Sequence, residues 1–164
     1  MILYIIRHAW ARDRDDPACP EDSLRPLTDE GRERFGRLVK ILAERGFAPG
    51  LIATSPLVRC RQTAEIVSRQ IRGQPAVVER DELAPGSDLA GLLAWTNGQS
   101  DRQDEIAWVG HAPDVEYLAG DLIGASRGGT RFAKGGVAAI QFDGPANLGT
   151  GTLWWLVTAK LLGC

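Results

Sequence analysis

The chain is poor in the residues that build disulfide frameworks and metal clusters. Its 164 residues include 3 cysteines and 2 histidines. Cys19, Cys60 and Cys164 lie far apart in the sequence and form no CxxC pair. The sequence therefore predicts neither a disulfide framework nor a zinc knuckle. We expect Cys60 to be a small buried helix residue.

The chain also lacks a strong excess of charge and a long hydrophobic run. Lys plus Arg number 19 and Asp plus Glu 21, so the net charge is -2, which gives no general attraction to nucleic acid or an anionic membrane. No apolar run approaches the ~18 residues that span a bilayer. The apolar residues 1–6 stop at Arg7 and His8, too early for a signal peptide. We expect a cytoplasmic protein with no nucleic-acid or membrane partner.

Short apolar runs alternate with helical periodicities. Four runs are predicted to be buried strands: residues 3–6, 51–53, 76–78 and 106–109. An apolar face with helical spacing follows each, and the helices are expected to begin near Thr28, Ser55, Asp88 and Pro113. The stretch 124–136 is predicted to be a loop, and residues 137–142 and 153–158 are two late strands that would form a hairpin. The pattern predicts one α/β domain over residues 1–164, with a mainly parallel sheet.

The chemically unusual side chains follow the predicted strands. Arg7 and His8 come directly after the first strand, Ser55 follows the second with Arg59 one helical turn later, and His111 follows the fourth. Since the carboxyl ends of parallel strands share one edge of a sheet, we expect these side chains to converge there. Each of them alone is also compatible with a solvated turn. Together they are typical of a site for a phosphoryl dianion.

Residue chemistry supports this interpretation. The planar guanidinium groups of Arg7 and Arg59 match phosphate oxygens in a bidentate manner. Backbone N–H groups at the start of the Ser55 helix would add further donors. Histidine acts either as a nucleophile or as a proton donor.

Four ordered segments resemble the motifs of the histidine phosphatase superfamily, the phosphoglycerate-mutase-like proteins. Residues 7–9 resemble its RHG/RHA motif, and residues 26–31 its PLTxxG segment. Residues 55–64 resemble its SPxxRAxQTA segment, with Cys60 where alanine is usual, and residues 109–111 its second-histidine motif. The resemblance implies a three-layer sandwich with helices on both faces of the sheet.

Two further segments resemble the SixA-type branch of that superfamily, whose members are phosphohistidine phosphatases. They are residues 82–86 and the ending 153–161, in a chain of similarly small size. A short chain with an open pocket would suit a phosphohistidine carried by a partner protein. A phosphatase of the same fold acting on a sugar or nucleotide phosphate is the alternative, and a non-catalytic phosphate-binding module is the less favoured one.

The resemblance also implies residue roles. His8 would be the nucleophile and become phosphohistidine, while Arg7, Arg59 and His111 would complete the phosphate pocket. Neighbouring arginines disfavour protonation of His8, as attack requires. They also suit a phosphoryl group that spreads charge over three oxygens. Because water then hydrolyses the intermediate, neither a metal nor another cofactor is expected.

A general acid is expected only for some substrates. Glu82, with Gly86 four residues later, fits the ExxxG-like context of the glutamate in larger members, Asp81 is adjacent, and an ordinary acidic loop is the alternative. A phosphohistidine imidazole leaves more easily than an alkoxide and needs little protonation. Replacing Glu82 by glutamine would then slow phosphoester hydrolysis far more than phosphohistidine hydrolysis.

The loop over residues 10–25 is expected to border the site. Trp10, Arg12, Arg14 and Arg25 are its candidate substrate contacts. The aspartates at positions 13, 15 and 16 do not directly follow a strand, so a metal-dependent phosphatase is not favoured.

Overall fold

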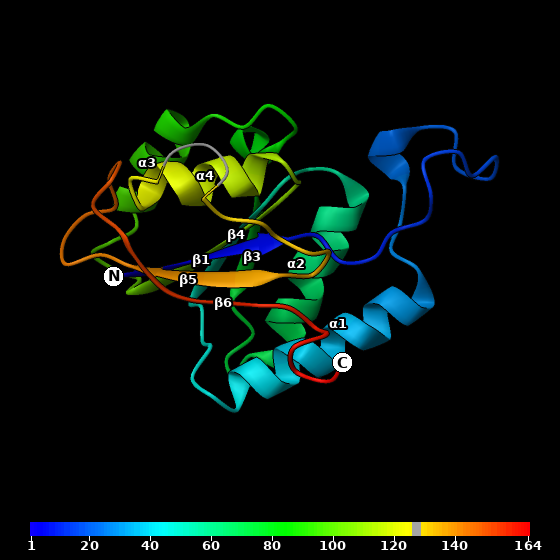
Figure 1. Ribbon diagram of the computed structural model, residues 1–164, viewed down its shortest axis with the longest axis horizontal. Coiled ribbons are helices and arrows are strands. Elements are labelled where there is room, and N and C mark those ends of the chain that lie inside the picture. The colour runs from blue at the N-terminus through cyan, green and yellow to red at the C-terminus, as the bar shows by residue number, and fades with distance from the viewer. Residues whose placement is uncertain (126–128) are drawn as a thin grey trace.

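A six-stranded sheet organises the described part of this computed structural model, which covers residues 1–125 and 129–164 (Figure 1). The strands are β1 (Ile2–Arg7), β2 (Leu51–Thr54), β3 (Ala76–Glu79), β4 (Glu105–Gly110), β5 (Val137–Gln141) and β6 (Thr152–Val157). Their order is β3-β2-β4-β1-β5-β6. The first four pair in parallel, and β5 pairs antiparallel with both β1 and β6. The predicted parallel sheet and late hairpin are confirmed.

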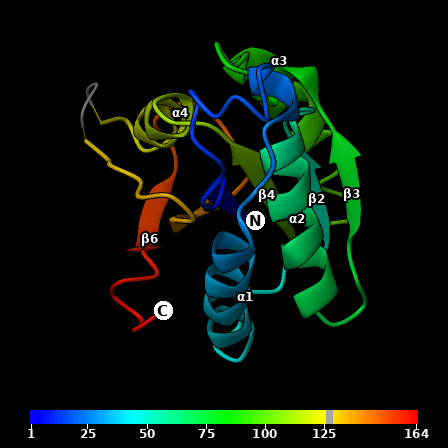
Figure 2. The same ribbon diagram turned by 90° about the vertical axis from the view of Figure 1, so that its right-hand side faces the viewer.

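Helices cover both faces of this sheet (Figure 2). The described α-helices are α1 (Asp29–Ala43), α2 (Val58–Gln70), α3 (Leu89–Asn97) and α4 (Asp114–Leu122). The short 3-10 helices η1 (Asp22–Leu24) and η2 (Asp81–Leu83) precede α1 and α3. α1 and α2 pack on one face, and α3 and α4 on the other (Figure 1). The expected three-layer sandwich is therefore present.

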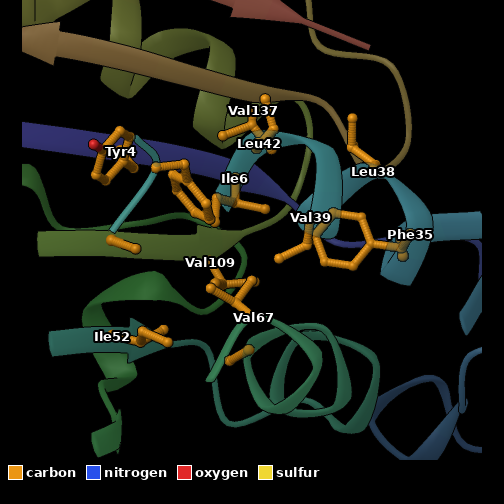
Figure 3. Close-up of a cluster of buried hydrophobic side chains, with 14 of the residues drawn as sticks. Tyr4, Ile6, Phe35, Leu38, Val39, Leu42, Ile52, Val67, Val109 and Val137 are labelled. Atoms are coloured by element: carbon orange, nitrogen blue, oxygen red, sulfur yellow. The ribbon is translucent and has the colours of Figure 1, made fainter. Parts of the chain in front are cut away.

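The alternation of side chains along β1 explains why both faces are buried. Leu3 and Ile5 enter the core cluster under α3 and α4, whereas Tyr4 and Ile6 enter the cluster under α1 and α2 (Figure 3). A strand covered on both sides must be apolar at every position. This burial holds the strand whose end carries Arg7.

The start of α1 fixes the loop that borders the carboxyl edge of the sheet. Thr28 caps α1 by accepting a hydrogen bond from the N–H of Gly31 at 3.0 Å. A Cβ at residue 31 would lie 2.4 Å from the carbonyl oxygen of Trp10, so only glycine allows the loop to cross here.

The start of α2 differs from the prediction. The helix begins at Val58 rather than at Ser55, with Leu57 as its extended N-cap residue. The reason is that Ser55 still belongs to the sheet edge, since its N–H donates to the carbonyl of Val109 at 3.0 Å.

The predicted loop over 124–136 is only partly described, because residues 126–128 lie outside the described residues. Within the described ranges, no helix combines the length and apolar character that a bilayer crossing requires.

Candidate active site

Three neighbouring strands place the candidate residues on one edge of the sheet. β1 pairs with β4 so that Arg7 lies opposite Gly110, and β4 pairs with β2 so that Val109 lies opposite Thr54. The ladder extends past β1, where the N–H of His8 donates to the carbonyl of Gly110 at 2.9 Å. The next residues of all three strands therefore meet at their carboxyl ends, as expected for a parallel sheet.

A pocket of about 430 Å³ opens at this edge. Arg7, His8, Arg59 and His111 all line it, and the centroids of the two imidazole rings are 5.4 Å apart. The remaining lining residues come from loops and helix starts: Asp13, Arg14, Asp22, Arg25, Pro85, Ala112, Pro113, Asp114 and Lys134. The convergence predicted from the strand ends is present in the structure.

His8 is arranged as a neutral base with a free ring nitrogen. Its Nδ1 lies 2.8 Å from the carbonyl oxygen of Ala9, which can only accept, so Nδ1 carries the proton and Nε2 keeps its lone pair. Burial is the main cause that lowers the pKa of His8 to about 3; the bond to Ala9 opposes this shift, and the charges of His111, Arg59 and Arg7 add to it. At neutral pH the imidazole is therefore uncharged, and Nε2 carries a lone pair.

Two of the pocket arginines, Arg7 and Arg59, each retain an unused donor. Nη1 of Arg7 donates to the carbonyl of Phe132 at 2.7 Å, and Nη1 of Arg59 donates to the carbonyl of Asp22 at 2.7 Å. The Nε of each is buried and finds no partner among the described residues. Because arginine stays charged in proteins, these are cations whose buried Nε–H groups are unpaired among the described residues, which suits an anionic ligand.

The imidazole of His111 contacts two buried side chains, those of Ser55 and Cys60. Its Nε2 lies 2.8 Å from Oγ of Ser55 and 3.4 Å from Sγ of Cys60. Burial, reinforced by the charge of Arg59, lowers the pKa of His111 to about 4. Cys60 is fully buried, as expected, and burial raises its thiol pKa to about 12. The thiol is thus a packing neighbour of His111.

Three predicted site residues lie outside the pocket lining. Ser55 is fully buried and its hydroxyl contacts His111 instead of the pocket. Trp10 packs on the α1 side of the core, with the guanidinium of Arg34 4.3 Å from the centre of its ring. Glu82 forms a hydrogen-bonded ion pair with Arg80. The structure does not bring these side chains into the lining of the pocket.

The pocket lining includes more residues than the sequence predicted, several of them from the loop before α1. Arg14 and Arg25 line the pocket as expected, whereas Arg12 pairs with Asp16 outside it. Asp22 was not predicted, nor were Lys134 and Asp114. Asp22 lies in η1, and Lys134 lies in a segment without regular secondary structure. In neither place does a periodic sequence pattern indicate which side chains face a pocket.

The two buried histidines predict a pH dependence of stability. In the unfolded chain they gain protons below about pH 6.5, but in the folded protein His111 stays neutral to about pH 4 and His8 to about pH 3. The unfolded state binds more protons in this window, so the free energy of unfolding should fall by about 2 kcal/mol per histidine between pH 7 and pH 5.

Urea denaturation in phosphate-free buffer measures this effect. The His8→Asn variant should lose about 2 kcal/mol less than the wild type over the same two pH values. An identical pH dependence of the two proteins would contradict a neutral, buried His8.

Comparison with known protein families assigns residues 3–126 to the histidine phosphatase superfamily (branch 1). The chain belongs to this superfamily. It is 36% identical over 144 residues to an uncharacterized protein of Picosynechococcus sp. (strain ATCC 27264 / PCC 7002 / PR-6), which covers 86% of this chain and 85% of that protein.

Solved structures with the same fold extend this result. The protein histidine phosphatase SixA complexed with tungstate is similar with a TM-score of 0.85 and 26% identity, over 99% of both chains. The α-ribazole phosphatase from Shigella flexneri has a TM-score of 0.67 and 20% identity, over 97% of both chains. The first of these proteins was solved with tungstate, a tetrahedral oxyanion, bound to it. The similarity to the second protein shows only that the two chains share a fold.

Proposed function

We propose that this protein is a phosphatase that works through a phosphohistidine intermediate on His8 and that its substrate is a phosphohistidine carried by a partner protein. One observation carries the proposal: the unprotonated Nε2 of His8 belongs to a pocket that also presents the guanidinium groups of Arg7 and Arg59, whose buried Nε–H donors have no partner among the described residues. A nucleophile within a cationic cradle is what phosphoryl transfer requires.

In the first step, the lone pair on Nε2 of His8 attacks phosphorus. The bond between phosphorus and the leaving group breaks, and the leaving group keeps the bonding pair and takes a proton from solvent water. Arg7 and Arg59 stabilise the charge on the transferring oxygens. In the second step a water oxygen attacks phosphorus, the bond to Nε2 breaks, and His8 regains its lone pair as inorganic phosphate forms and a proton is released.

Two observations favour phosphohistidine as the substrate. The carboxylate of Glu82, which is the predicted proton donor, is paired with Arg80 away from the pocket lining. An imidazole leaving group tolerates this absence better than an alkoxide does. The likeness to SixA over the full chain points to the same substrate class.

A small phosphoester is the alternative substrate, since a protein of the same fold is an α-ribazole phosphatase. Values of kcat/KM distinguish the two substrate classes. They are measured for a histidine-phosphorylated carrier protein and compared with those for p-nitrophenyl phosphate and a set of sugar and nucleotide phosphates. We expect the phosphohistidine protein to exceed every ester by at least about 100-fold. A sugar or nucleotide phosphate that matched or exceeded it would establish the alternative.

The position of Glu82 gives a sharper expectation than the sequence allowed. Since its carboxylate pairs with Arg80, Glu82→Gln should change the turnover of both phosphohistidine and a sugar phosphate, whose leaving group is an alkoxide, by less than about three-fold. Steady-state rates at pH 7 measure this, with Glu79→Gln on the sheet edge as a matched control. A selective loss on the sugar phosphate would instead assign Glu82 as the general acid.

A further inference from the structure

Asp22 makes the contacts that orient Arg59 in the pocket. Its main-chain carbonyl accepts from Nη1 of Arg59 at 2.7 Å, and its Oδ2 accepts from Nη2 at 3.0 Å. Asp22 belongs to η1 and Arg59 to α2. This double contact therefore connects the loop before α1 to the helix that carries Arg59. The side chain of Arg59 is only 3% exposed, whereas that of Asp22 is 46% exposed.

The two contacts occupy one end of the guanidinium group. A guanidinium has five N–H donors in a fixed planar fork. Asp22 takes one from each terminal nitrogen, which leaves the edge formed by Nε and the remaining N–H of Nη2. Nε on that edge is buried and has no partner among the described residues.

Asp22 is itself held in place by a second arginine. Nε and Nη2 of Arg25 lie 3.1 and 3.0 Å from Oδ1 of Asp22, and Nη1 of Arg25 donates to the carbonyl of Arg12. Partial desolvation raises the pKa of Asp22, but the charges of Arg59 and Arg25 outweigh it and hold the pKa below its usual value. The carboxylate is therefore ionised and bridges three arginines of the pocket, since Nε of Arg14 also lies 3.6 Å from its Oδ1.

We propose that Asp22 is a positioning residue: it holds the outer end of Arg59 so that the Nε edge faces the phosphoryl oxygens. This inference deepens the proposed function and rests on it, because it takes the ligand of Arg59 to be a phosphoryl group. In this role Asp22 needs no contact with the reacting atoms. It acts through the orientation of Arg59.

Substitution of Asp22 tests the sign of this effect. Asp22→Asn removes one negative charge from a pocket built for an anion, and charge alone would tighten phosphate binding. Loss of positioning has the opposite effect, and we expect the Kd for inorganic phosphate to rise by about ten-fold or more. Asp15→Asn, an exposed change in the same loop outside the pocket lining, should leave the Kd within about two-fold.

Isothermal titration calorimetry with inorganic phosphate measures both variants without an activity assay. A Kd for Asp22→Asn equal to or tighter than that of the wild type would overturn the proposal. If the wild type binds no phosphate at all, the proposed function itself fails, and this inference fails with it.

The wild-type protein offers a second test that needs no variant to fold. In ¹H–¹⁵N spectra of arginine side chains, added phosphate should shift the Nε–H signal of Arg59, identified by its loss in Arg59→Lys. We expect that signal to move with the same saturation as the ring signals of His8. Movement of His8 alone, with the Arg59 signal unchanged, would contradict the proposed use of the Nε edge.

Discussion

Replacing His8 with alanine is expected to lower kcat for the phosphohistidine protein by at least about ten-thousand-fold, because the bond to phosphorus then has no nitrogen to form on. Arg7, Arg59 and His111 remain in this variant, so the pocket should still bind inorganic phosphate. Activity is thus expected to disappear while phosphate affinity stays within about ten-fold of the wild type.

Stopped-flow or quench assays of turnover, with phosphate binding measured in parallel, check this outcome. Turnover by the wild type would also exclude a non-catalytic binding module, because such a module binds phosphate without turning over any substrate. Turnover by His8→Ala within about ten-fold of the wild type would contradict covalent catalysis by this residue.

The second large effect is expected at Arg59. Arg59→Met preserves much of the buried side-chain volume but removes the guanidinium, and the transferring phosphoryl group loses one of the two arginines, Arg7 and Arg59, that are proposed to contact it. Loss of a preorganised donor to a developing anion costs roughly 100- to 1,000-fold in rate, so we expect kcat to fall by about 1,000-fold. Arg59→Lys should recover only part of this, because an ammonium group cannot present a planar fork.

The same helix provides a matched control for Arg59. Arg61 is two residues further along α2, where its exposed side chain pairs with Glu79. Arg61→Met removes the same charge from the same helix and should change kcat by less than about two-fold. Similar losses in the Arg59 and Arg61 variants would indicate a general effect of charge and contradict a specific phosphate contact.

The strand-end residues could be predicted because parallel pairing constrains them. Once residues 3–6 and 106–109 are identified as buried strands, Arg7, His8 and His111 must emerge at one edge of the sheet. The helix that follows β2 then directs Arg59 towards the same edge. These positions depend on backbone register, which hydrophobic patterns encode.

The residues that were misplaced depend on side-chain partners, which no pattern in one sequence reveals. Glu82 follows β3 as predicted, but Arg80 two residues earlier captures its carboxylate. Trp10 follows His8 closely, yet its ring packs beside α1 with Arg34. Asp22 escaped prediction because the loop before α1 has no period that would mark its side facing the pocket.

Covalent phosphorylation of His8 is the central claim, and rapid-quench trapping tests it most directly. The enzyme is mixed with a carrier protein bearing radiolabelled phosphohistidine, quenched in alkali within milliseconds, digested, and mapped by mass spectrometry. We expect an acid-labile, alkali-stable label on the peptide that contains His8, and none in His8→Ala. Complete turnover by the wild type with no label on His8 at any time would contradict the account.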